Sequence, residues 1–219
     1  MDFEYLFELL CGGVVKGSIY ALIALGYTMV YGIIQLINFA HGEVYMIGAF
    51  VAFIVAGIMT LTGYSGMSVL VLAAIVAVIY AAAYGYTLEK IAYRPLRKAP
   101  RLSPLISAIG ASIFLMNYVQ LAQTPDFLPF PELVTDFEFL EPISRYMSSV
   151  DVVILAVTAV TMTALTVLIK YTRIGKAMRA TQQDQVMARL VGINVDRVIS
   201  ATFIIGSVLA AIGGVLIAS

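Results

Sequence analysis

Residues 36–43 read Leu36-Ile37-Asn38-Phe39-Ala40-His41-Gly42-Glu43, a short polar stretch inside an otherwise apolar run. The only histidine of the chain lies here, beside a carboxylate and three residues after an asparagine. No lysine or arginine occurs between Lys16 and Lys90. Polar groups at membrane depth are costly and usually face a bundle interior or a solute path. The stretch therefore predicts a membrane protein that handles a polar solute.

The composition is that of an integral membrane protein. Of the 219 residues 61% are hydrophobic and 12% are charged, whereas soluble domains carry about 25% charged residues. A span needs roughly 20 apolar residues, and the long run 44–88 divides at the turn-forming residues 62–68. All segments are apolar all round, without the alternation of a membrane barrel, so the predicted fold is an all-α polytopic helical bundle. Its six predicted spans are residues 10–34, 44–61, 69–88, 104–123, 151–169 and 198–219.

The charges predict the orientation of the bundle. Eleven of the 13 basic residues fall in residues 89–101 and 170–197, whereas residues 124–151 are acidic with one arginine. The positive-inside rule places the two basic loops in the cytoplasm. Six spans with the N-terminus outside satisfy this placement at every loop.

Small residues recur on two of the predicted spans. Gly13 and Gly17 form a G-x-x-x-G pattern, and Ala210, Gly213 and Gly214 lie on the last segment. Such residues let helix backbones approach closely. The simplest interpretation is that they pack the chain against itself.

The polar stretch itself has two interpretations. Gly32, Gly42 and Gly48 surround it, which suggests a broken or kinked helix. In a membrane such a break is tolerated where it lines a cavity or packs in protein, and then the Asn38 amide and free backbone groups line a solute path. Alternatively it is a tight cytoplasmic loop in which His41 and Glu43 are solvated and Asn38 caps the next helix.

The basic loop 170–197 contains good helix formers followed by Gly192, a natural helix stop. The pattern predicts a short cytoplasmic helix between two spans. It could dock into a groove on a soluble partner or lie on the membrane surface among lipid headgroups. The other basic loop contains Pro95 and Pro100, and its cations are expected to anchor the cytoplasmic face.

No motif indicates an enzyme. The chain has no G-x-x-x-x-G-K-[ST] loop, no G-x-S-x-G and no H-E-x-x-H. One histidine and one cysteine do not make a set of metal ligands. We therefore expect no catalytic residue, no metal and no cofactor on this chain.

Two stretches resemble a known family. Residues 17–34 (GSIYALIALGYTMVYGII), followed by Ile37-Asn38-Phe39-Ala40-His41-Gly42-Glu43, resemble the permeases of branched-chain amino-acid ABC importers, and more narrowly the H-type member of the permease pair. The loop Asp184-x-x-x-Ala188-x-x-x-Gly192-Ile193-Asn194-x-Asp196-Arg197 is similar to that family's coupling loop, although the usual acid-Ala-Ala opening is absent.

The resemblance implies a transport subunit with no enzymatic activity of its own. Residues 173–192 would dock on a cytoplasmic ATPase, with Arg179, Asp184, Ala188 and Gly192 as coupling residues. ATP would bind on two such partner ATPases, a periplasmic binding protein would deliver the solute, and a second permease would complete a heterodimer in the bacterial inner membrane. Residues 1–219 would form one permease domain that contains the coupling loop 170–197. Because family members generally continue beyond a point like Ser219, we expect the domain to be incomplete at its C-terminus.

The resemblance leaves the solute and the path residues as expectations. A path for Leu, Ile or Val needs apolar walls and a few polar groups, and a tyrosine offers an apolar body with a polar tip. The candidates for the solute path are Tyr20, Tyr27, Tyr31, Asn38, His41 and Glu43. Related importers for urea or short amides are the nearest alternative. An ATP-independent channel for a small neutral solute and a non-transport scaffold are more distant ones.

Overall fold

The computed structural model describes residues 3–97, 99–100, 102–124, 128–131, 133–134 and 147–219, and the regular structure among them is helical. Six helices are long and apolar enough to cross a membrane. They are α1 (Phe3–Ile34), α2 (His41–Leu61), α3 (Met67–Leu88), α4 (Leu102–Ala122), α5 (Ser149–Tyr171) and α8 (Val195–Ala218). Each overlaps one predicted segment, so the six-span helical bundle is confirmed. Most of the predicted acidic outer loop lies outside the described residues, and its placement stays a prediction.

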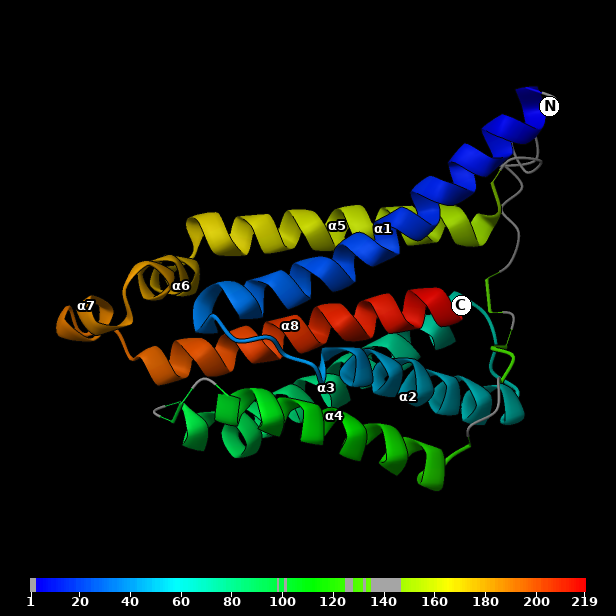
Figure 1. Cartoon of the computed structure of the whole chain (residues 1–219). Helices are drawn as coiled ribbons and strands as arrows, with labels where there is room; N and C mark the ends of the chain where they lie inside the picture. Colours follow the sequence, from blue (N-terminus) through cyan, green and yellow to red (C-terminus); the bar gives the residue numbers. More distant parts are fainter. Residues whose placement is uncertain (1–2, 98, 101, 125–127, 132, 135–146) are drawn as a thin grey trace.

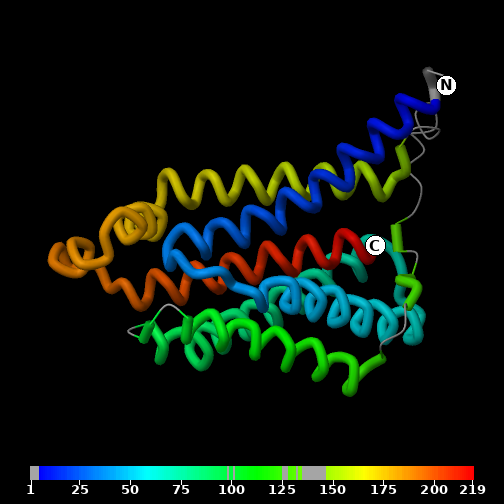
Figure 2. The backbone as a smooth tube through the Cα atoms, viewed as in Figure 1, coloured from blue at the N-terminus to red at the C-terminus, as the bar shows by residue number. Residues whose placement is uncertain are grey.

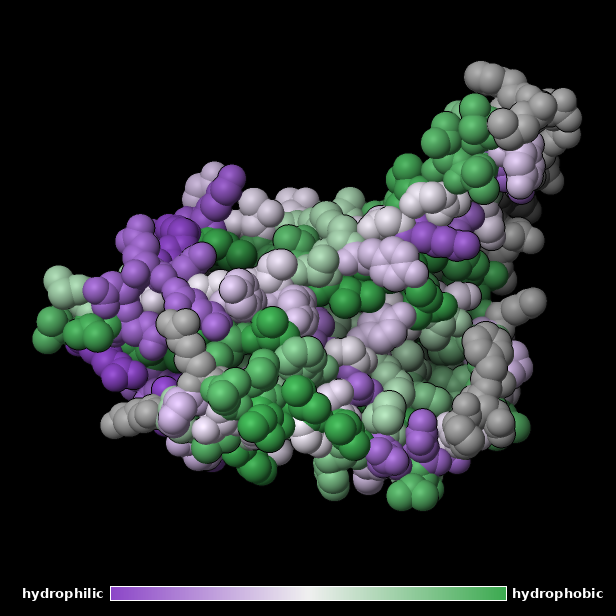
Figure 3. Space-filling view, viewed as in Figure 1, coloured by the Kyte–Doolittle hydropathy of each residue, from purple (hydrophilic) through white to green (hydrophobic). Residues whose placement is uncertain are grey.

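Short helices lie at one end of the bundle. Helices α6 (Arg173–Gln183) and α7 (Gln185–Leu190) connect α5 to α8 and extend beyond the ends of the spans (Figure 1). Two short turns, η1 (Glu89–Tyr93, π-helical) and η2 (Arg94–Leu96, 3-10), continue α3 at the same end. Figure 3 shows hydrophilic side chains gathered at the end that carries α6 and α7 and apolar surface along the spans.

Helix α8 forms the centre of the bundle. In its most apolar 18-residue window 61% of the residues are buried, against 17–28% in the other five spans. It packs against α1, α2 and α3. Small residues make the close packing possible, because a Cβ on Gly214 would lie 2.5 Å from the Tyr45 carbonyl oxygen of α2. The predicted close approach on the last segment is thus present within the chain.

This close approach gives a first prediction. Replacing Gly214 with Ala should lower the thermal unfolding temperature in detergent, because backbone atoms of α2 and α8 must move apart, at a cost of about 1–3 kcal/mol. The matched control is Gly57→Ala, where a Cβ meets no described atom within 4 Å. Equal unfolding temperatures for the two variants would contradict the packing described here.

Gly13 and Gly17 behave differently. A Cβ on either residue would meet no described atom within 4 Å. The N-terminal part of α1 projects away from the other spans (Figure 1). The expectation that this G-x-x-x-G pattern packs the chain against itself is therefore wrong for the described residues. Val15 between the two glycines is buried, whereas both glycines lie on the exposed face of α1.

The chain breaks between α1 and α2. Helix α1 ends at Ile34, and Gln35 has a φ of 56°. This is a left-handed backbone conformation that residues other than glycine rarely adopt. The chain then runs back along the bundle, so that α2 begins partway along its length (Figure 1, Figure 2). Residues 35–40 thus form an irregular connection between two helices that run in opposite directions, rather than a break within one helix. We call this connection the break.

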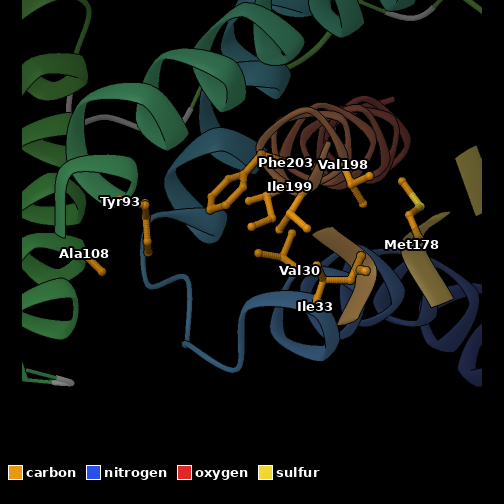
Figure 4. Packing of buried hydrophobic residues seen from close by; sticks show 10 residues of the cluster. Val30, Ile33, Tyr93, Ala108, Met178, Val198, Ile199 and Phe203 are labelled. Carbon is orange, nitrogen blue, oxygen red and sulfur yellow. The ribbon is translucent and has the colours of Figure 1, made fainter. Parts of the chain in front are cut away.

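A buried cluster joins the helices at the end of the bundle that carries α6 and α7. Val30 and Ile33 of α1, Tyr93 of η1, Met178 of α6 and Phe203 of α8 belong to it (Figure 4). The rings of Tyr93 and Phe203 lie 5.0 Å apart between centroids. The cluster places the break beside both η1 and α6.

Candidate solute path and coupling segment

Asn38 is fixed inside the bundle. Its side chain is buried, and its Oδ1 accepts a hydrogen bond of 2.9 Å from the Tyr93 hydroxyl. The residue before α2 is Ala40, and no side chain caps that helix. The interpretation of Asn38 as a helix cap in a solvated loop is therefore wrong. An amide buried in an irregular segment between two apolar helices is typical of protein-lined interior positions of membrane bundles.

His41 lies where α1 and α8 cross. It is 2% exposed, and its imidazole packs beside Gly26, where a Cβ would lie 3.1 Å from Cε1 of His41 and 3.0 Å from the Gly206 carbonyl oxygen. The Tyr27 ring meets it edge-on at 5.8 Å between centroids. Its Nε2 has no hydrogen-bond partner among the described residues. The solvated-loop interpretation of His41 is therefore also wrong.

Glu43 points to a third element. Its Oε1 accepts a 2.9 Å hydrogen bond from the Ser112 hydroxyl of α4, and the residue is half-buried. The polar groups of the break therefore contact different neighbours: Asn38 meets η1, His41 meets α1 and α8, and Glu43 meets α4.

The remaining path candidates lie apart. Tyr20 and Tyr31 are 63% and 49% exposed on α1, whereas Tyr27 is half-buried against the histidine. Four cavities between described residues are lined by none of the six candidate side chains. The structure thus gathers Tyr27, Asn38, His41 and Glu43 around the break and leaves Tyr20 and Tyr31 on an outer face of the chain.

The predicted coupling loop, residues 170–197, contains two short helices, α6 and α7, rather than one, and is called the coupling segment below. The Thr172 hydroxyl caps α6 by accepting from the Gly175 amide at 3.0 Å. Asp184 then adopts an extended conformation, and its Oδ1 accepts from the Val186 and Met187 amides at 2.7 and 3.0 Å. An aspartate at this position is a strong helix N-cap. The single helix expected in residues 170–197 is therefore interrupted at Asp184.

The other coupling candidates hold this segment in place. Arg179 donates through its guanidinium to the carbonyl oxygens of Ile169 and Lys170, at the end of α5. Ala188 is buried in the same cluster as Val30 and Phe203. Gly192 has a φ of 85°, which favours glycine, so the predicted helix stop is confirmed.

One face of α7 is apolar and exposed. Four side chains at and just after this helix are between 57% and 75% exposed: Val186, Met187, Leu190 and Val191. The helix lies at the far end of the molecule, beyond the spans (Figure 1). An apolar patch on a polar end of a protein indicates an interaction site.

A buried ion cluster was missed by sequence reasoning. The Glu89 carboxylate is fully buried, pairs with Arg97, and accepts a 2.7 Å hydrogen bond from the Ser200 hydroxyl. Arg97 also donates to Asp196 at 2.6 Å, and Arg94 lies 3.6 Å from the same carboxylate. Burial lowers the pKa of Arg97, and the two neighbouring carboxylates oppose that shift. The available signal was the position of Glu89, the single acid that closes a 45-residue uncharged run.

The expectation about metal ions involves the acidic side chains of the ion cluster and of the break. Among the described residues, no group of three or more His, Cys, Asp or Glu side chains lies close enough together to hold a metal ion. The Glu43 and Glu89 carboxylates contact serine or arginine, and the His41 imidazole packs beside Gly26.

Fold and site together define a multi-pass helical membrane protein with a buried irregular connection between its first two spans and a capped segment beyond the ends of the spans. Residues 9–219 match the family model described as branched-chain amino acid transport system / permease component, and the chain belongs to this family of transport permeases. The H-type resemblance is confirmed. The chain is 48% identical over 220 residues to the high-affinity branched-chain amino acid transport system permease protein LivH of Salmonella typhimurium, covering 99% of this chain and 71% of the relative.

Other relatives give the same result. LivH of Escherichia coli is also 48% identical, with the same coverage. The corresponding permease protein BraD of Pseudomonas aeruginosa is 47% identical over 219 residues, 98% of this chain and 71% of the relative. No solved structure matches the chain.

Proposed function

We propose that this chain is the H-type permease subunit of an ATP-driven importer, and that it carries branched-chain amino acids. The observation that carries the proposal is 48% identity over 99% of the chain to permeases of high-affinity branched-chain amino acid transport systems. The buried polar break inside an apolar bundle supports the proposal. A free amino acid with charged amino and carboxylate groups and an apolar side chain needs apolar walls with a few polar groups.

The partner that hydrolyses ATP would dock on α7. The exposed apolar face of α7 projects from the polar end of the molecule (Figure 3). Helices commonly bind a soluble partner by placing an apolar face in its groove. The fixed position of Ala188 and Gly192 behind this face supports the choice of α7 as the contact with a cytoplasmic ATPase. ATP binds on the two ATPases of the complex.

The charge distribution supports a membrane orientation for the chain, and the orientation suggests where the remaining partners bind. The basic loops and α7 lie at one end of the bundle and define the cytoplasmic side by the positive-inside rule. The N-terminus is then outside, in a bacterial inner membrane, and a periplasmic binding protein meets the opposite end.

We place Tyr27, Asn38, His41 and Glu43 along the solute path. Tyr20 and Tyr31 reach the path where the second permease subunit covers the exposed face of α1.

Uptake measurements in a strain deleted for this gene test the proposal. Accumulation of radiolabelled leucine should fall on deletion, return with the wild-type gene, and disappear when cellular ATP is depleted. Radiolabelled urea serves as the comparison solute. Leucine uptake that is unaffected by the deletion would contradict the solute assignment, and uptake that survives ATP depletion would favour a channel.

A further inference from the structure

The coupling segment is tied to the chain before the break. Gln185, the first residue of α7, donates through Nε2 to the Ile33 carbonyl oxygen at 3.0 Å. The Gln182 amide of α6 lies beside Gly32, where a Cβ would be 3.4 Å from Nε2. The last carbonyls of a helix have no partner within it. A side chain of the coupling segment thus caps the C-terminal end of α1, two residues before Gln35.

The other end of the coupling segment is tied to the chain after that point. Asp196 follows Gly192 by four residues and accepts from Arg97, which pairs with the buried Glu89. Glu89 opens η1 and Tyr93 closes it. The Tyr93 hydroxyl donates to Asn38 at 2.9 Å. Three polar contacts and the turn η1 therefore connect Asp196, at the start of α8, with Asn38 in the break.

The contact from Gln185 and the contacts from Asp196 both end on residues 33–38. This stretch contains the end of α1, the positive φ of Gln35 and three further residues without helical structure. Residues at the ends of helices commonly absorb the backbone changes of a conformational transition. A movement of α7 relative to the spans would act on this stretch through Gln185 on one side and through Asp196 on the other.

We propose that Glu89, Arg97 and Tyr93, together with Gln185, are positioning residues that couple movement of α6 and α7 to the α1–α2 break. They set the location of Asn38 and His41, and so the state of the solute path, according to the state of the ATPase. This inference rests on the proposed function for the identity of the partner that moves α7. Contiguous polar networks that join two mobile elements are a physical route for such coupling.

The test uses Tyr93→Phe in the complete transporter, reconstituted in liposomes with its binding protein. The variant removes one hydroxyl and keeps the ring against Phe203. A nitroxide label is attached at Ile37→Cys, within the break, after the single native cysteine is removed by Cys11→Ser. Its electron paramagnetic resonance line shape is compared in the nucleotide-free and vanadate-trapped states, and leucine uptake is measured per ATP hydrolysed.

The line shape should differ between the two states in the wild-type background, and Tyr93→Phe should abolish the difference. Leucine uptake per ATP hydrolysed should fall about fivefold, which is the low end of the changes that typical coupling free energies produce. Gln185→Met should do the same. The matched control is Tyr86→Phe, which removes a hydroxyl from a tyrosine that lies under the Lys90 ammonium and outside both ties. A merely structural role lowers uptake and ATP hydrolysis together and leaves their ratio unchanged.

The outcomes separate this inference from the proposed function. A nucleotide-dependent line shape without leucine uptake shows that the solute assignment is wrong while the coupling stands. Leucine uptake with an unchanged line shape response and an unchanged ratio in Tyr93→Phe and Gln185→Met overturns the coupling inference and leaves the importer in place.

Discussion

Replacing Leu190 with Glu should abolish leucine uptake while the six-span bundle still assembles. Leu190 is 75% exposed at the end of α7, so a charge there costs the isolated chain little. In the docked complex the same charge would be buried in an apolar contact. Loss of a central apolar anchor typically costs 2 kcal/mol or more of binding free energy, roughly 30-fold in affinity.

The measurement is the amount of ATPase that copurifies with tagged permease, together with leucine uptake. The matched control is Leu61→Glu, because Leu61 is 89% exposed at the end of α2 that lies opposite α7. Retention of the ATPase by Leu190→Glu would show that α7 is not the docking contact. If Leu190→Glu retains the ATPase and Leu61→Glu loses leucine uptake, the surface that transport requires lies at the other end of the bundle.

The second large effect is expected at the buried ion cluster. Replacing Glu89 with Leu should destabilise the protein by about 3–5 kcal/mol, because it removes a buried partner of Arg97. At roughly 2–4 °C per kcal/mol for a chain of this size, the unfolding temperature should fall by at least about 6 °C. Thermal unfolding in detergent measures the change.

The double variant Glu89→Leu with Arg97→Leu separates the pair from its members. It should recover most of the lost stability, because a buried pair replaced by apolar groups is often neutral, and Asp196 is half-exposed and keeps Arg94. A double variant as unstable as the single one would show that the cluster stabilises the fold as a pair rather than only by avoiding an unpaired charge.

Much of the fold could be predicted because hydrophobicity and glycine act locally. Six apolar segments, the turn at residues 62–68 and the stop at Gly192 depend on residues within a few positions of one another. The break at residues 35–40 was also visible, since polar groups interrupt an apolar run. Its burial was not, because solvated and interior interpretations fit the same residues until η1 is seen to supply Tyr93.

The arrangement around the spans could not be predicted for a physical reason. Helices that are apolar all round give no periodic signal of which face meets protein, so the exposed positions of Tyr20 and of Gly13 were not readable. The ion cluster connects Glu89 to Asp196 through Arg97, although the two acids lie more than 100 positions apart in the sequence. The interruption at Asp184 depended on a cap that competes with helical continuation, and helix propensity alone favoured continuation.

The buried carboxylate also affects how the protein is made. At roughly 5–20 residues per second, Asp196 and Ser200 leave the ribosome at least about 5 s after Glu89, so neither is available when the third span enters the bilayer. Arg97 follows Glu89 by only eight residues. The acid can therefore enter the membrane beside its own counter-charge, and the contacts to α8 are added when that helix arrives and closes the bundle.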